Sequence, residues 1–348
     1  MNDLSTLEET LVAQPGGEAE DDALALEPSK EFVVTPAILA ITERALAYLH
    51  TGYAVHLSGP AGTGKTTLAF HIAAQLGRPA VLLHGDHEFG SSDLVGRESG
   101  YRKSRVVDNY ISSVVKLEEE GRALWTDNRI TTACRLGQTI IYDEFNRSKA
   151  EANNPFLSIL SEGVLNVPRL HGRGEGYVSV HPLFRAIFTS NPSEYAGVHR
   201  AQDALLDRVI TIELGHYDRE TEIQITASRS GVSLTAATRI VDLVRLCRNE
   251  SRQPHYPTIR ACIAVARVLA YCDADAEPND PVFLGACGDI LGPALRREAN
   301  GDTVMTDQVA ATGQVMRLIR NVCGADVPAD VAAAIQAGGP RSRRRARP

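Results

Sequence analysis

A glycine-rich run at positions 59–66, GPAGTGKT, matches the phosphate-binding pattern G-x-x-x-x-G-K-[ST]. Its glycines let backbone N–H groups surround phosphate oxygens, and a helix that starts at the lysine adds positive partial charge. Lys65 is expected to reach the β- and γ-phosphates, and the Thr66 hydroxyl to bind Mg²⁺. The residues predicted to bind ATP are Gly59, Pro60, Ala61, Gly62, Thr63, Gly64, Lys65, Thr66 and Thr67.

A pair of carboxylates, Asp143-Glu144, directly follows the apolar run Thr139–Tyr142. At the end of a buried strand beside a phosphate loop, Asp143 is expected to hold Mg²⁺ together with Thr66. The second carboxylate, Glu144, is then placed to activate the attacking water. An ordinary polar strand end is the alternative interpretation, and the position after a phosphate loop favours the catalytic one.

Three further polar residues are candidates for the reaction. Asn191 follows an apolar run and precedes a proline, so it either orients the water and senses the γ-phosphate or simply makes a turn. Arg208 can project to a neighbouring subunit's phosphate or form a surface salt bridge with Asp207 or Asp203. Arg200 is a rival for the first role. Arg260 opens a predicted helix, where a cation opposes the helix dipole, and this misfit favours a role at the nucleotide.

The elements that must position these residues alternate between strand and helix, which predicts an α/β fold. The sheet is expected to be parallel, because a strand, a loop, a helix and a strand imply a right-handed crossover. The fold class is thus a P-loop parallel sheet sandwiched by helices, followed by a small all-α lid domain. Strands are predicted at 54–58, 80–83, 139–142, 184–189 and 209–214, and helices near 36–50, 65–75, 105–120 and 150–162.

From Asp218 onward the strand patterns stop, and helices are predicted at 218–230, 233–249, 258–273 and 282–298. Four segments follow from this change of pattern. They are an acidic disordered arm at 1–30, an α/β nucleotide-binding domain at 31–217, a helical lid domain at 218–325 and a flexible Arg-rich tail at 326–348.

The composition of the 348 residues is that of an ordinary globular protein, with 43% hydrophobic and 23% charged side chains. No apolar run approaches the roughly 18 residues of a membrane span, and no signal pattern opens the chain, so we expect no membrane contact. Six cysteines without a C-x-x-C pair favour reduced thiols in the cytoplasm over a zinc site.

The net charge of −7 is unevenly distributed. Eight acidic side chains and one lysine lie in residues 1–30, and five arginines in 341–348. The arginine tip invites a nucleic-acid hypothesis, but the body between the two ends is slightly acidic and lacks a basic-groove signal. Nucleic acid is therefore not expected as a partner.

In their order along the chain, these motifs resemble those of AAA+ ATPases of the MoxR branch. Within that branch, the chain is similar to the gas vesicle protein N family, GvpN. The resemblance rests on GPAGTGKTTLA at 59–69, HGDHEFGSSDLVG at 84–96, YDEFNRSKAEANN at 142–154, QDALLDRVITIEL at 202–214 and PTIRACIAVARVLA at 257–270. It implies Walker A at 59–66, Walker B at Asp143-Glu144, sensor 1 at Asn191, an arginine finger at Arg208 and sensor 2 at Arg260.

The resemblance further implies an ATP- and Mg²⁺-dependent homo-oligomeric ring, a hexamer, that remodels or chaperones gas vesicle shell or accessory proteins. Residues 84–103 and 165–181 are expected to be insertions, with Gly172, Gly174 and Gly176 at a hairpin tip that grips the substrate. The alternatives are a general MoxR chaperone for metalloenzyme maturation, a nucleic-acid-stimulated ATPase, and a nucleotide-gated scaffold with little turnover.

Overall fold

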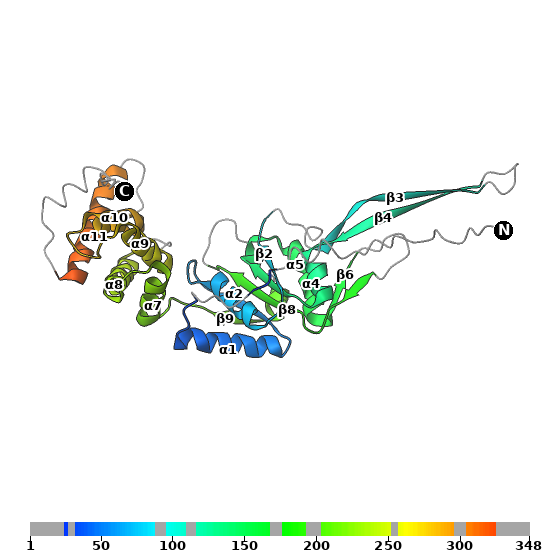
Figure 1. Cartoon of the computed structure of the whole chain (residues 1–348), viewed down its shortest axis with the longest axis horizontal. Helices are drawn as coiled ribbons and strands as arrows, with labels where there is room; N and C mark the ends of the chain where they lie inside the picture. The colour runs from blue at the N-terminus through cyan, green and yellow to red at the C-terminus, as the bar shows by residue number, and fades with distance from the viewer. Residues whose placement is uncertain are drawn as a thin grey trace, which may run out of the picture. The chain divides into compact units, whose positions relative to one another are not determined.

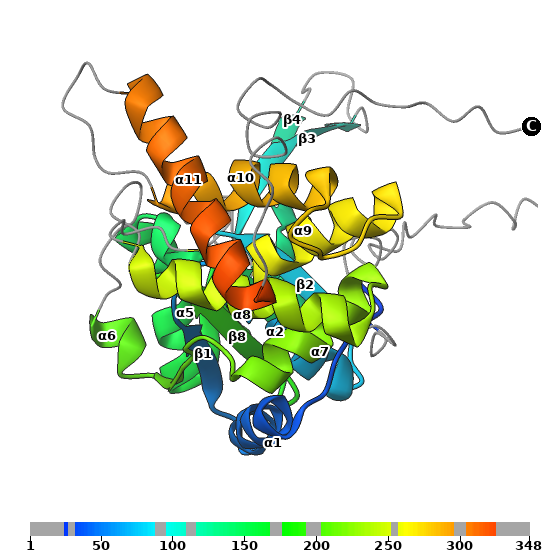
Figure 2. The same ribbon diagram turned by 90° about the vertical axis from the view of Figure 1, so that its left-hand side faces the viewer.

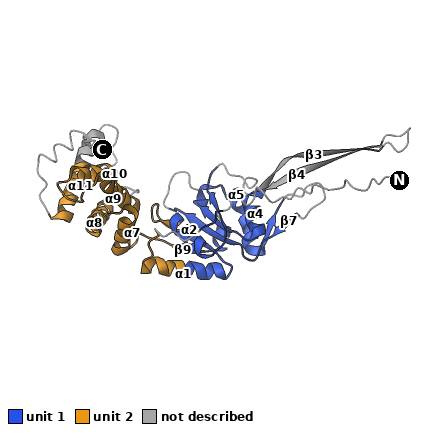
Figure 3. Cartoon of the chain, in the orientation of Figure 1, with its two compact units in different colours: residues 1–28, 44–58, 66–212 blue, residues 29–43, 59–65, 213–348 orange. Residues whose placement is uncertain are grey.

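The computed structural model divides into two compact units (Figure 3). The first contains 44–58 and 66–212, and the second contains 29–43, 59–65 and everything from 213 onward. The structure describes residues 24–26, 32–87, 95–108, 116–167, 176–192, 203–251, 257–295 and 304–324. The predicted arm at 1–30, apart from 24–26, and the predicted tail at 326–348 lie outside these residues. The predicted domain boundaries stay predictions.

The first unit is built on a five-stranded sheet in the order β2-β5-β8-β1-β9. Each strand is short and apolar, as expected for a sheet covered on both faces. The pairs β1–β8, β2–β5 and β5–β8 are parallel. The strands are β1 (Ala54–Ser58), β2 (Ala80–His84), β5 (Thr139–Asp143), β8 (Arg185–Ser190) and β9 (Val209–Glu213). The predicted parallel α/β fold is confirmed.

Helices sandwich this sheet (Figure 1). They are α1 (Pro36–His50), α2 (Lys65–Gln75), α4 (Arg129–Leu136), the 3₁₀ turn η1 (Phe145–Arg147), α5 (Ala150–Glu162) and α6 (Asp203–Leu206). The first helix begins as predicted, since the Ile38 N–H donates to Thr35 Oγ1 over 3.4 Å and Pro36 needs no donor partner. A cluster of aromatic rings, Tyr142, Phe145, Phe156 and Phe188, fills the space between sheet and helices.

The helix predicted at 105–120 is wrong. Strands β3 (Gly96–Asp108) and β4 (Lys116–Asp127) form an antiparallel ribbon there, with Gly96 opposite Asp127 and Asp108 opposite Lys116 (Figure 1). The glutamates at 118–120 are good helix formers, but their backbone pairs with residues 104–106 of the preceding strand. Such pairing overrides local preference and leaves no trace in the periodicity of one segment.

A second hairpin lies where an insertion was predicted. Strands β6 (Val164–Asn166) and β7 (Tyr177–Ser179) are antiparallel, with Leu165 opposite Val178. The predicted hairpin is confirmed by these strands, whereas its tip at 168–175 lies outside the described residues. Tyr177 is half-exposed on β7. The role of this hairpin in gripping a substrate stays a prediction.

The part of the second unit that follows Glu213 is all-helical (Figure 2). Three of its helices begin at residues whose side chains accept backbone N–H bonds, namely Asp218, Ser233 and Thr258. The core of this unit includes Ile240, Val244, Leu269, Phe283 and Ile319. The helices are α7 (Arg219–Ser230), α8 (Leu234–Glu250), α9 (Ile259–Cys272), α10 (Pro281–Leu295) and α11 (Val304–Cys323). None of the described helices is long and apolar enough to cross a membrane.

Strand β1 buries a histidine between its two neighbours. His56 is 4% exposed, and its Nε2 lies 2.8 Å from Ser190 Oγ on β8. Its Nδ1 lies 3.0 Å from Thr211 Oγ1 on β9. Burial lowers the pKa of His56 to about 4, so the ring is neutral at neutral pH and links three strands.

We expect the free energy of unfolding to fall as the pH is lowered from about 6.5 toward about 4. Over this range the unfolded His56 takes up a proton that the folded ring refuses, because its pKa is lowered by burial. The full effect is about 3 kcal/mol. Urea midpoints between pH 7.5 and 4 should show this slope in the wild type and a weaker one in His56→Gln. Equal slopes would assign the pH dependence to other groups.

Candidate nucleotide-binding site

The candidate site lies at the carboxyl end of β1, where the chain turns into α2. Strand β1 sits between β8 and β9, whereas β2 and β5 lie on the far side of β8. The direction of winding therefore reverses beside β1, and ligands of open parallel sheets bind at such a point. Strand β1, the loop at 59–64 and helix α2 together provide the strand–loop–helix context that a phosphate-binding loop requires.

Within the loop, the ammonium of Lys65 is held by backbone carbonyls. Its Nζ donates to the carbonyl oxygens of Gly59 and Pro60, over 2.9 and 2.7 Å. The residue is only 7% exposed. The positive charge of Lys65 is thus kept inside the loop. A phosphate group can replace the two carbonyls there, because it is a stronger acceptor for an ammonium group than a neutral carbonyl is.

The Asp143 carboxylate joins the first helical turn of α2 to the end of β8. Its Oδ1 accepts hydrogen bonds from Thr66 Oγ1 over 2.7 Å and from Thr189 Oγ1 over 2.6 Å. Asp143 is 7% exposed, so these two hydroxyls compensate for much of the hydration that the carboxylate loses. Three separate segments therefore meet at one oxygen atom.

Glu144 has a backbone conformation that is unusual for its residue type. Its φ of 52° and ψ of 41° place it in the left-handed region, at a cost of about 1–3 kcal/mol. Its N–H donates to Thr189 Oγ1 over 2.9 Å, which helps to hold this conformation. The half-exposed carboxylate is paired with Arg147, with Oε2 2.8 Å from Nε. The chain leaves the sheet at this left-handed residue, directly after β5 ends. Asp143 is therefore buried at the end of the strand, whereas the Glu144 carboxylate is half-exposed.

Asn191 is buried directly after β8. Its backbone carbonyl accepts a hydrogen bond from the side chain of Asn146 over 3.3 Å, and Asn146 is itself buried in η1. The segment that carries Glu144 is therefore linked to the segment that carries Asn191.

The two candidate arginines each make contacts of their own. Arg208 is exposed after α6, where its guanidinium donates to the Ser161 hydroxyl and to the carbonyl of Ala204. Arg260 is exposed in the first turn of α9, and its N–H donates to Thr258 Oγ1 over 3.3 Å. The rival Arg200 lies outside the described residues. The roles of both described arginines stay predictions.

The donor set near Asp143 fits a magnesium ion. Mg²⁺ prefers oxygen ligands and is usually bound by one or two protein oxygens plus substrate phosphates and water. Thr66 and Asp143 already place a hydroxyl and a carboxylate in contact. Within the described residues there is no cluster of three or more His, Cys, Asp or Glu that could hold a metal without a substrate.

Sequence reasoning missed two polar residues that complete the site, Thr189 and Asn146. The parallel register puts Tyr142 opposite Phe188, so Thr189 lies next to Asp143 at the sheet edge. That register could have been inferred from the two apolar runs, had their ends been aligned. Asn146 carried no signal, because only the folded turn brings it to Asn191.

The fold and these contacts define a P-loop ATPase of the AAA+ class, and residues 54–209 match the model of the AAA domain (dynein-related subfamily). Proteins of this class bind nucleotides.

The chain belongs to the GvpN family of gas vesicle ATPases. It is 45% identical to the gas vesicle ATPase GvpN of Ancylobacter aquaticus, over 90% of this chain and 87% of that protein. It is also 45% identical to GvpN1 of Halobacterium salinarum, over 78% and 77% of the two chains. The protein CbbQ of Hydrogenophilus thermoluteolus is 26% identical over 54% of this chain and 62% of its own length. The predicted family, its MoxR-like type and the predicted ATPase class are confirmed.

We expect Thr189→Val to lower the ATPase rate by about tenfold, because it removes a donor to Asp143 and the acceptor for the Glu144 N–H. Thr139→Val is the matched control. Thr139 is equally buried at the opposite end of β5, but its hydroxyl has no hydrogen-bond partner among the residues that the structure describes. Steady-state hydrolysis should separate the two isosteric changes, and equal rates would remove Thr189 from the site.

Proposed function

We propose that this protein is a Mg²⁺-dependent ATPase that works as a homo-oligomeric ring, a hexamer, and remodels or chaperones proteins during gas vesicle assembly. The observation that supports hydrolysis most directly is the contact between Thr66 and the Asp143 carboxylate, with Glu144 next in the chain. The target is proposed from the relatives, which are named gas vesicle ATPases.

Binding depends on the phosphate loop. The backbone N–H groups of residues 59–66 and the N-terminus of α2 attract the phosphates. Lys65 leaves the carbonyls of Gly59 and Pro60 for the β- and γ-phosphate oxygens, which are stronger acceptors for an ammonium. Thr66 and Asp143 would hold Mg²⁺, which neutralises charge on the phosphates when it is bound.

Hydrolysis depends on Glu144 and Asn191. Glu144 accepts a proton from the water that attacks the γ-phosphate, after its carboxylate has turned away from Arg147. The Asn191 amide orients the same water. Arg208 and Arg260 offset the charge that develops on the γ-phosphate, the first from a neighbouring subunit and the second from the lid.

Glu144→Gln should retain ATP binding and lose at least about 100-fold in turnover, because an amide cannot accept the proton. Lys65→Ala should lose binding itself. Equilibrium binding of a fluorescent ATP analogue and phosphate release measure the two effects. Normal hydrolysis by Glu144→Gln would refute the assignment of the base.

The same two variants test the cellular role when each replaces the wild-type protein in a gas-vesicle-forming host. Electron microscopy should show vesicles with neither variant. Vesicles formed with Glu144→Gln alone would instead indicate a nucleotide-gated scaffold. Normal vesicles in the complete absence of the protein would favour a general chaperone.

Arg208→Ala should be inactive alone but regain activity when mixed with Lys65→Ala. In a mixed ring, an intact phosphate loop on one subunit meets an intact Arg208 on its neighbour, as an arginine supplied in trans requires. Phosphate release measured across mixing ratios should peak near equal amounts. No recovery at any ratio, with mixed rings verified by size, would place Arg208 in its own subunit's site or outside the site.

A further inference from the structure

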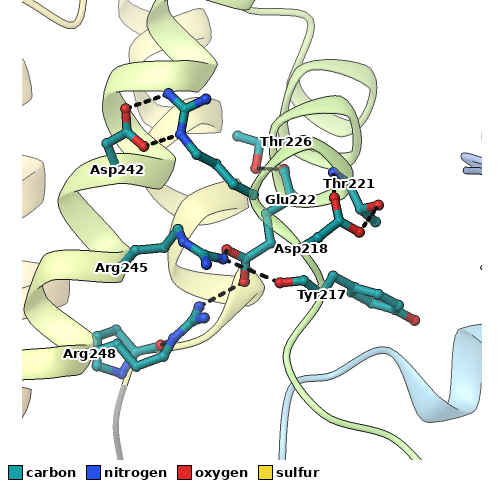
Figure 4. A network of polar contacts seen from close by, with 10 residues as sticks. Tyr217, Asp218, Thr221, Glu222, Thr226, Asp242, Arg245 and Arg248 are labelled. Atoms are coloured by element: carbon teal, nitrogen blue, oxygen red, sulfur yellow. Dashed lines mark hydrogen bonds and ion pairs between the residues drawn. The ribbon is translucent and has the colours of Figure 1, made fainter. Parts of the chain in front are cut away.

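A buried carboxylate lies between two arginines in the helical part of the second unit (Figure 4). Glu222, on α7, is 1% exposed. Its Oε2 lies 2.8 Å from Nη1 of Arg245, and its Oε1 lies 2.8 Å from Nη2 of Arg248. Both arginines are on α8. This group of three is called the Glu222 triad here.

Each arginine of the triad also donates a hydrogen bond to a backbone carbonyl. Arg245 donates to the carbonyl of Tyr217 over 3.2 Å, just before α7 begins. Arg248 donates to the carbonyl of Pro257 over 2.9 Å, just before α9. One buried carboxylate thereby orients two guanidinium groups, and these fix two connecting segments.

Both of those segments lie against the phosphate loop. A Cβ added at Gly62 would lie 2.3 Å from Thr258 Oγ1, next to Pro257. One added at Gly64 would lie 3.7 Å from the hydroxyl of Tyr217. Both glycines have positive φ values, 75° and 79°, so the loop conformation that residues 258 and 217 contact is one that few other residues adopt.

Tyr217 is held in buried surroundings, and burial raises its pKa to about 12. Stability alone explains the triad poorly, since a buried carboxylate held by ion pairs seldom contributes more than an apolar side chain of similar volume. A role in holding geometry accounts for it better.

We propose that Glu222, Arg245 and Arg248 are positioning residues that fix Tyr217 and Thr258 against the phosphate loop and so keep Gly62 and Gly64 in the conformation that binds nucleotide. This inference rests on the proposed function of the loop. It concerns residues that make no contact with the nucleotide themselves.

The chain provides a matched control on the same two helices. Arg219 on α7 and Asp242 on α8 form a two-bond ion pair, with distances of 2.6 and 2.7 Å (Figure 4). This pair is partly exposed, and neither of its hydrogen bonds involves Tyr217 or Pro257. Asp242→Asn therefore breaks an α7–α8 ion pair without releasing either carbonyl.

The experiment compares Glu222→Gln with Asp242→Asn in the full-length protein. If the loop occupies its binding conformation a tenth as often, the apparent Kd rises about tenfold. We expect this rise for Glu222→Gln in equilibrium binding of a fluorescent ADP analogue, and a similar rise in KM. The kcat should fall less than about threefold, because bound nucleotide selects the competent loop. Asp242→Asn should leave Kd and KM within about twofold of wild type.

Two further variants separate positioning from folding. The triple change Glu222→Leu, Arg245→Met and Arg248→Met removes the buried charges, so its melting temperature should stay near that of the wild type while its Kd remains raised. Glu222→Asp keeps the charge and should restore part of the affinity. A triple variant with wild-type Kd and KM, or equal Kd values for Glu222→Gln and Asp242→Asn, would overturn the proposal.

Failure of the proposed function would look different. In that case the wild-type protein would bind the analogue no better than Lys65→Ala does. A wild type that binds and hydrolyses ATP, alongside a Glu222→Gln variant with unchanged Kd and KM, would reject only the positioning role.

Discussion

The arrangement of the candidate site in the first unit depends on one carboxylate oxygen, which accepts hydrogen bonds from two hydroxyl groups. Asp143 Oδ1 ties the start of α2 to the end of β8 through Thr66 and Thr189. A buried carboxylate is costly unless such donors surround it. The parallel order β5-β8-β1 supplies them, because it brings the carboxyl ends of three strands to one edge of the sheet. The topology and the chemistry therefore constrain each other at this point.

The residues that sequence reasoning placed best are those whose roles are set by local spacing. The phosphate loop, the carboxylates at the end of β5 and the helix starts near 218, 233 and 258 are each recognisable within a few positions, and these three helices begin within one residue of the predicted positions. Their signals are local because a turn, a strand end or a helix start is determined by neighbouring residues.

Features that depend on pairing between two segments were missed by reasoning that took each segment by itself. The β3–β4 ribbon joins Gly96 to Asp127, and a helix was predicted instead because glutamates 118–120 favour helices locally. Thr189 was missed for a related reason, since its hydroxyl matters only once β8 lies beside β5. The Glu222 triad joins two helices, and charges at 222, 245 and 248 resemble any solvated face until packing buries them.

The two carboxylates at the end of β5 differ in their surroundings because the two residues differ in backbone conformation. Asp143 belongs to the sheet, and its side chain is fixed by hydroxyls from both sides. Glu144 leaves the sheet in a left-handed conformation, and its carboxylate is half-exposed and paired with Arg147. A group that holds a cation benefits from rigid, buried surroundings, whereas a group that must take a proton from water needs access to it and freedom to turn. The left-handed conformation of Glu144 thus gives different surroundings to the two adjacent residues for which we propose different functions. Thr189 serves both, because its one hydroxyl donates to Asp143 and accepts the Glu144 N–H.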